Sequence, residues 1–136
     1  MKYEAKVKYT KLNEISGKEQ VVSEIYIVND AETFSDAEYQ TFKYMAERTP
    51  STIMAAIKIS DIEDVSSGIG DWYYKARIAS TSIDEISGKE KQTISVLLVQ
   101  SDDFSDSLDL CNTWVGGSML DSEVVSITKT KIVDII

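Results

Sequence analysis

The feature that most constrains the fold of this chain is an internal duplication. Residues 3–19 and 74–90 align without a gap and share nine identities in seventeen positions. The alignment resumes at three later places: residues 25–28 over 96–99, residues 34–36 over 104–106 after a one-residue gap, and residues 62–65 over 132–135. A solenoid requires three or more stacked units, so two copies indicate a closed domain with pseudo-two-fold symmetry.

Each copy opens with the pattern of a β-hairpin. Residues 3–9 alternate apolar and charged side chains, which is the period of a half-buried strand. The apolar members of this alternation are Tyr3, Ala5, Val7 and Tyr9. A loop over residues 12–19 follows, in which Gly17 can adopt positive φ, and residues 21–28 predict the second strand. Copy two repeats the pattern, with Gly88 in the loop.

A helix is predicted after each hairpin. In copy one Ser35 is the expected N-cap, with Glu38 completing a capping box and Phe34 packing onto Tyr39, and the helix ends before Pro50. Its expected apolar face consists of Tyr39, Phe42, Met45 and Ala46.

The helix of copy two has the same predicted layout. Ser105 is its expected N-cap, and Gly116 and Gly117 end it. Its expected apolar face consists of Leu108, Cys111, Trp114 and Val115.

A last strand completes each copy, over residues 53–62 and residues 124–135. The order ββαβ–ββαβ predicts an α+β fold: an internal duplication of a ββαβ unit, with a mostly antiparallel sheet and two helices packed on it. The junction over residues 66–71 is too short for a flexible linker and is expected to be a turn. We therefore expect one domain over residues 1–136, made of repeats 1–66 and 71–136, and leave open whether the repeats share one continuous sheet.

The composition excludes several classes of protein. The chain has no histidine, which removes the usual general base and the commonest metal ligand, so we expect no enzyme, no cofactor and no metal site. A net charge of −9 argues against generic binding to duplex DNA. No apolar run is long enough to cross a membrane, no signal peptide is recognisable, and the single cysteine fits a reducing compartment, so we expect a cytoplasmic protein.

Three other features have a simple structural explanation. Cys111 falls on an apolar helix face and is expected to be an inert buried side chain. The acidic clusters at residues 61–64 and 102–106 lack EF-hand spacing and favour capping and solvated surface. The repeated Ile-Ser-Gly-Lys-Glu lacks the pattern of a phosphate-binding loop and predicts a hairpin turn, with Lys18 and Lys89 as two symmetric anion-binding side chains in the alternative.

The strongest indication of function is a pair of basic strand faces. Lys6 aligns with Arg77, with Lys8 beside the first and Lys75 beside the second. Exposed aromatic side chains beside these cations would provide stacking surfaces, the combination used by proteins that bind single-stranded nucleic acid. The expected aromatic residues are Trp72, Tyr73 and Tyr26.

An alternative explanation of the same residues remains open. Basic residues on an outward strand face promote solubility and protect sheet edges, and aromatic residues at strand spacing are commonly core. Residues 25–28 are apolar on both faces, so the basic faces are either exposed or partly buried in an interface between the repeats or between two chains of a homodimer.

The chain also resembles a known family. The resemblance lies in the opening strands YEAKV and YKARI, the SGKE hairpins, LLVQ followed by DFSD, and the ending SEVVSITKTKIVDI. These motifs are similar to those of a small two-repeat family of unknown function from gut Bacteroidetes and their tailed, crAss-like phages. The resemblance implies a phage or mobile-element protein in the host cytoplasm, and it provides no catalytic residues to carry over to this chain.

Three functions are consistent with these features. The leading hypothesis is a non-enzymatic protein that binds single-stranded nucleic acid through Lys6, Lys8, Lys75 and Arg77. The second is a protein that binds or sequesters an anionic small molecule, such as a nucleotide, in paired sites. The third is a structural or protein-interaction module. None of them involves a membrane.

Overall fold

The computed structural model describes residues 1–49, 51–66 and 68–136 and contains two helices and eight strands. The chain forms two compact units: unit 1 contains Met1–Asp61 and Lys131–Ile136, and unit 2 contains Ile62–Thr130. Unit 1 is built from β1 (Tyr3–Leu12), β2 (Glu19–Val28), α1 (Phe34–Ala46), β3 (Ile53–Ile59) and β8 (Ile132–Ile135). Unit 2 is built from β4 (Asp64–Ser66), β5 (Trp72–Ile83), β6 (Glu90–Ser101), α2 (Phe104–Gly116) and β7 (Asp121–Lys129). The α+β class predicted from the sequence is confirmed.

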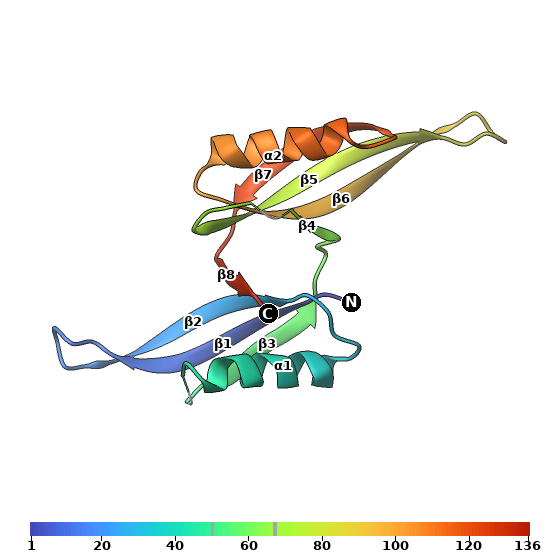
Figure 1. Cartoon of the computed structure of the whole chain (residues 1–136). Helices are drawn as coiled ribbons and strands as arrows, with labels where there is room; N and C mark the ends of the chain where they lie inside the picture. Colours follow the sequence, from blue (N-terminus) through green and yellow to red (C-terminus); the bar gives the residue numbers. More distant parts are fainter. Residues whose placement is uncertain (50, 67) are drawn as a thin grey trace. The chain divides into compact units, whose positions relative to one another are not determined.

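Each unit contains a separate four-stranded sheet with one helix on one face (Figure 1). The strand order is β3-β1-β2-β8 in sheet 1 and, read in the same direction, β7-β5-β6-β4 in sheet 2. In sheet 1, β1 pairs antiparallel with β2 and β3, and in sheet 2, β5 pairs antiparallel with β6 and β7. The short strand β8 pairs parallel to β2, and the short strand β4 pairs parallel to β6. The two sheets thus have the same topology.

The predicted last strand of each copy is wrong in one respect. The strand predicted over residues 53–62 ends early, because β3 stops at Ile59 and the short strand β4 begins only at Asp64. The strand predicted over residues 124–135 is divided between β7, which ends at Lys129, and the short strand β8, which begins at Ile132. The long strands β3 and β7 pair within their own copy, but β4, at the end of copy one, pairs with β6 of copy two. Likewise β8, at the end of copy two, pairs with β2 of copy one. Each sheet is therefore completed by a strand from the other copy.

The hairpins confirm the predicted turn and strand pattern. Gly17 and Gly88 have φ of 68° and 69°, the left-handed conformation that glycine adopts without strain. In β2 the consecutive residues Tyr26, Ile27 and Val28 are all buried, as expected for a strand covered on both faces.

The helix starts differ from the prediction by two residues. Thr33 caps α1 by accepting a hydrogen bond from the Asp36 amide (3.1 Å), and Asp103 caps α2 by accepting one from the Asp106 amide (2.8 Å). Ser35 and Ser105 already lie inside the helices. The expected contact of Phe34 with Tyr39 is also wrong, because the Phe34 ring packs edge-on against Tyr3 at 5.0 Å.

The helix faces that contact the sheets are made mainly of small side chains. Helix α1 buries Ala37, Thr41 and Met45, and α2 buries Ser107 and Cys111. The predicted face of α1 is therefore wrong at Tyr39, which is 65% exposed, and at the exposed Ala46. In α2, Trp114 and Val115 pack against the core as predicted, together with Leu110. Small residues lie at the contact because they let the helix backbone approach the sheet closely.

Two predicted features involve residues outside the described ranges: Pro50, expected to follow α1, and Ser67 in the junction. The rest of the junction packs tightly within unit 2. A Cβ on Gly68 would lie 2.0 Å from the Gln100 carbonyl oxygen, and one on Gly70 would lie 2.1 Å from the Ser101 carbonyl carbon. The Gln100 side chain donates to the Gly70 carbonyl at 2.8 Å. These close contacts explain why glycine occupies both positions.

Candidate functional site

The basic residues of copy one lie on the face of sheet 1 opposite α1. Alternate residues of β1 point toward the helix, where Tyr3 and Val7 join the core, so Lys6 and Lys8 point to the other side. Lys6 is exposed and Lys8 is half-buried. We call this surface, in either sheet, the helix-free face.

Copy two places its basic residues at the matching positions. Lys6 pairs with Ile25 and Ala56, whereas Arg77 pairs with Val96 and Ser126, the aligned residues of copy two. Arg77 is exposed and Lys75, which precedes the buried Ala76, is half-buried. Lys6 and Arg77 therefore occupy the same register position in the two sheets.

The helix-free faces are only partly open. In sheet 1 Ile27 is fully buried, and in sheet 2 Leu98 is fully buried while Val96 is 6% exposed. On sheet 1 the exposed part extends from Lys6 toward the hairpin, where Ser23 and Val21 are exposed. A ligand of the helix-free face can therefore reach that end of the sheet, and not the part around Ile27.

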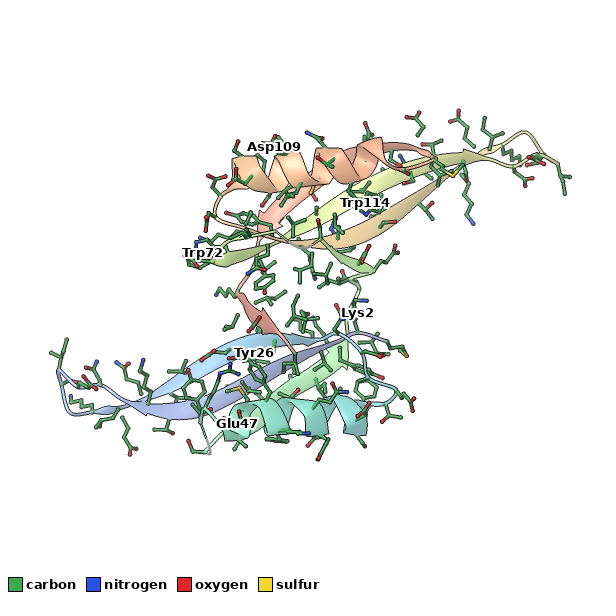
Figure 2. All side chains as sticks on the ribbon, viewed as in Figure 1. Lys2, Tyr26, Glu47, Trp72, Asp109 and Trp114 are labelled. Carbon is green, nitrogen blue, oxygen red and sulfur yellow. The ribbon has the colours of Figure 1, made fainter. Side chains whose placement is uncertain are left out.

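The aromatic residues expected beside these cations are mostly inaccessible. Tyr73 is 6% exposed and Tyr26 is 3% exposed, so the prediction that they form exposed stacking surfaces is wrong. Tyr26 packs against Met45 on the helix side of sheet 1. Trp72, labelled in Figure 2, is 47% exposed. The Lys129 ammonium lies 3.5 Å above the centre of the Trp72 ring. Of the three predicted aromatic residues, only Trp72 is accessible.

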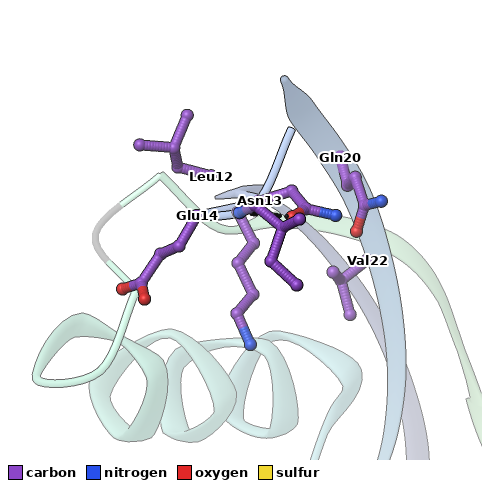
Figure 3. Close-up of a pocket in the computed structure, with 7 residues that line it drawn as sticks. Leu12, Asn13, Glu14, Gln20 and Val22 are labelled. Atoms are coloured by element: carbon purple, nitrogen blue, oxygen red, sulfur yellow. Dashed lines mark hydrogen bonds between the residues drawn. The ribbon is translucent and has the colours of Figure 1, made fainter. Parts of the chain in front are cut away.

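The two hairpin loops that carry Lys18 and Lys89 are built alike. The Asn13 side chain accepts from the Ile15 amide at 2.9 Å, as Asp84 does from the Ile86 amide at the same distance. The bond from the Ile86 amide, together with bonds from the side chain and amide of Ser87, holds the pKa of the Asp84 carboxyl below its usual value. In copy one the loop and the adjoining ends of β1 and β2 line an open hollow of about 550 Å³ (Figure 3). The exposed Lys18 and Lys89 each lie beside a hydrogen-bonded turn. The sequence identity between the two loops is explained largely by the residues that this turn requires.

A tyrosine–carboxylate network in unit 1 was missed by the sequence analysis. Both Tyr9 and Tyr26 donate hydrogen bonds to the Glu24 carboxylate, Tyr26 at 2.6 Å. The hydrogen bond to Glu24, followed by burial, raises the pKa of Tyr9 to about 12. The pKa of Tyr26 is also raised above its usual value, first by burial and then by the hydrogen bond to Glu24. Both hydroxyls therefore stay protonated and serve as donors at neutral pH.

A third tyrosine, Tyr44, extends this network. The Tyr44 hydroxyl donates to Asp134 of β8 at 3.0 Å, and its ring lies 5.4 Å from the ring of Tyr26. Burial raises the pKa of Tyr44, and the hydrogen bond to Asp134 adds to the effect. The Arg48 guanidinium lies 3.9 Å above the Tyr44 ring. The signal in the sequence was the difference between copies: the residues aligned with Tyr9, Glu24 and Tyr26 are Ser80, Ser95 and Leu97.

One comparison identifies the family. The domain of unknown function DUF4494 matches residues 1–136. The chain belongs to the DUF4494 family. No curated protein and no solved structure matches the chain. The DUF4494 domain here comprises both copies and both exchanged strands, because its match covers both units.

The remaining polar features of this DUF4494 domain have structural roles. Cys111 is fully buried, and burial raises the pKa of its thiol. Asp102 and Asp103 accept hydrogen bonds from the backbone at Asp71 and Asp106. Within the described ranges, no group of three or more carboxylate or cysteine side chains could hold a metal ion. In the same part of the chain, no helix is long and apolar enough to span a membrane.

Proposed function

We propose that this DUF4494 protein is a non-enzymatic binder of single-stranded nucleic acid. The observation that carries the proposal is the equivalent placement of Lys6 and Arg77 on the helix-free faces, with Lys8 and Lys75 two residues away on the same strands. Cations spaced along a strand can follow the phosphates of an extended chain, and the net charge of −9 then limits binding to this local surface.

Base stacking contributes little to this proposal. Among the predicted aromatic residues only Trp72 is accessible, and the Lys129 ammonium already contacts the face of its ring. Binding through phosphates without stacking has little base specificity and falls steeply with salt. We therefore expect weak, sequence-tolerant and salt-sensitive binding, with Lys18 and Lys89 adding contacts beyond the sheets.

The test is fluorescence anisotropy with labelled single-stranded DNA and RNA of increasing length over a salt series. A variant with Lys6, Lys8, Lys75 and Arg77 all changed to Ala is expected to lose binding and its salt dependence. The control variant changes Lys11, Lys43, Lys91 and Lys131 to Ala. These four lysines are exposed and lie off the helix-free faces, and the control has the same net charge as the first variant. Oligonucleotide binding that is unchanged in the first variant, or equally reduced in both, contradicts the proposal.

The setting of this activity is part of the same proposal. The resemblance to a family from gut Bacteroidetes and crAss-like phages supports a phage or mobile-element protein that acts in the host cytoplasm. Detection of the protein in the soluble fraction of infected cells, together with phage single-stranded DNA or RNA after crosslinking, is the expected result. Recovery with membranes, or crosslinking to no nucleic acid, would contradict it.

A further inference from the structure

A hollow of about 460 Å³ lies beside the last turns of α1 in unit 1. It is lined by Gln40, Lys43, Tyr44, Glu47, Arg48 and Ile136. The volume is within the range of sites for small ligands. The hollow is distinct from the helix-free face, because α1 covers the opposite side of sheet 1 (Figure 1).

The floor of this hollow is held in place by hydrogen bonds. Tyr44 is fixed by its bond to Asp134, whose other carboxylate oxygen accepts from the Ile135 amide at 2.8 Å. The Gln40 side chain donates to the Asp30 carbonyl at 2.9 Å, and the Ile136 amide donates to the Ile27 carbonyl at 2.7 Å. Because these bonds already exist, a ligand would meet a surface that needs little ordering.

Two cations border the hollow without a carboxylate partner. Arg48 stacks its guanidinium on the Tyr44 ring, which leaves the edge of the guanidinium available for hydrogen bonds. Lys43 lines the same hollow. Within the described residues, neither Lys43 nor Arg48 forms an ion pair. A planar guanidinium beside an ammonium suits a phosphate group, which accepts two parallel hydrogen bonds from arginine.

The carboxylate of Glu47 narrows the choice of ligand. It lies between Lys43 and Arg48 in the sequence and lines the same hollow. A carboxylate repels an extended polyanion, but it accepts hydrogen bonds from hydroxyl and amino groups. The lining therefore favours a small molecule with one phosphate group and several hydrogen-bond donors over a nucleic acid strand.

Copy two has no equivalent of this site. The residues aligned with the five side chains from α1 and its C-terminal cap are Leu110, Thr113, Trp114, Gly117 and Ser118. No cation remains among them. The lining of this hollow is therefore not repeated in copy two, and one molecule per chain is expected.

We propose that the hollow beside α1 in unit 1 binds a small phosphate monoester with hydrogen-bond donors, of the class of a 5′-mononucleotide. Arg48 and Lys43 bind the phosphate, Glu47 accepts from hydroxyl or amino groups, and Tyr44 positions Arg48. This site does not depend on the binding of single-stranded nucleic acid by the helix-free faces.

Isothermal titration calorimetry at low salt tests the proposal, with AMP, GMP, CMP, UMP, ribose 5-phosphate and inorganic phosphate as probes. We expect 1:1 binding of at least one mononucleotide and weaker binding of inorganic phosphate. Arg48→Ala is expected to weaken binding about tenfold or more, as for the loss of charge-assisted hydrogen bonds. Tyr44→Phe keeps the ring under Arg48 but removes the bond to Asp134, and is expected to weaken binding less.

The controls separate this site from the other proposal. The Lys6, Lys8, Lys75 and Arg77 variant is expected to bind the mononucleotide normally, and Lys58→Ala is expected to do the same. If no probe binds at millimolar concentration, or if Arg48→Ala binds as well as the wild type, the proposal is wrong. A lower melting temperature of Arg48→Ala without any nucleotide binding would show that the cations only stabilise the helix C-terminus.

Discussion

The two units share a topology but differ in where they place polar groups between helix and sheet. Unit 1 contains the Tyr9–Glu24–Tyr26 network near the hairpin, where unit 2 has Ser80, Ser95 and Leu97. Near the start of the helix the relation is reversed. There unit 2 contains a buried hydrogen bond between Ser101 and Ser107. When the two helices are aligned at Phe34 and Phe104, the corresponding residues of unit 1 are the buried Ala31 and Ala37.

This difference shows how a packed core tolerates polar residues. In each unit the polar residues are present together with their partners, and in the other unit all members of the set have changed. A single member without its partner would leave a donor or an acceptor unsatisfied in the core. Among the described residues, no buried side-chain polar atom lacks a partner. The two units therefore differ by whole sets of contacting residues.

The largest expected effect comes from moving one member of the network to the other unit. Leu97→Tyr adds a hydroxyl without a carboxylate partner and extra volume at a position 2% exposed, beside Ile78 and Cys111. We expect a loss of about 3 kcal/mol or more in the free energy of unfolding. Urea denaturation followed by tryptophan fluorescence measures it, because Trp72 and Trp114 both lie in unit 2. A loss below about 1 kcal/mol would mean that this core adapts freely.

Removing the acceptor of the network should have the next largest effect. Glu24→Gln is expected to lower the free energy of unfolding by about 1–3 kcal/mol, because its side chain carries no charge and one fewer acceptor oxygen.

The same variant should change the pH dependence of stability. The Tyr9 pKa is about 12 in the folded chain and near 10 when unfolded. Stability from this shift is present below pH 10 and is lost as pH rises to about 12. Ultraviolet titration of the tyrosines should show Glu24→Gln ionising at lower pH. Identical titration curves for variant and wild type would argue against the network.

Removing a helix cap should have an effect of intermediate size on the stability of each unit. Thr33→Ala and Asp103→Ala should each cost about 1 kcal/mol, and Asp103→Ala somewhat more, because its charge also interacts with the helix dipole. Ser35→Ala and Ser105→Ala serve as controls and should change stability by less than about 0.5 kcal/mol. Thermal denaturation followed by circular dichroism measures these losses. Larger losses for the two serine variants than for Thr33→Ala and Asp103→Ala would mean that the serines are the caps.

The smallest expected effect concerns an ion pair present in one unit. On sheet 1 the Lys58 Nζ lies 3.7 Å from Oε2 of Glu4. The aligned residues of sheet 2 are Lys75 and Thr128, which cannot form an ion pair with each other. Lys58 is largely exposed, so Lys58→Ala should cost less than about 0.5 kcal/mol, and the loss should shrink in high salt. A loss above about 1 kcal/mol in urea denaturation would show that this pair is stronger than exposed pairs normally are.

Much of the fold could be predicted because local patterns determine it. The alternation in β1, the glycines of the hairpin turns and the apolar residues 25–28 gave the correct strands and class. The caps were misplaced because Thr33 and Ser35 are both good capping residues, and only tertiary contacts such as that of Phe34 with Tyr3 select one. The helix face was misjudged because large apolar residues were favoured over Ala37 and Thr41.

The site was harder to predict for a related reason. The positions of Lys6 and Arg77 follow from strand alternation and could be read from the sequence. The contact of Tyr44 with Asp134 could not, because it joins residues 90 positions apart through the exchanged strand β8. The burial of Tyr73 likewise depends on long-range packing, which the strand pattern does not report.

The exchanged strands also determine the order in which the chain can complete its units during synthesis. Unit 2 is one continuous segment, whereas unit 1 lacks β8 until residues 131–136 have been made. At about 5–20 residues per second, the 69 residues of unit 2 separate these events by roughly 3 to 14 seconds. During that interval the edge of β2 around Ile25 and Ile27 has no β8 to pair with and is open to wrong partners. Unit 1 is thus the first to be started on the ribosome and the last to be finished.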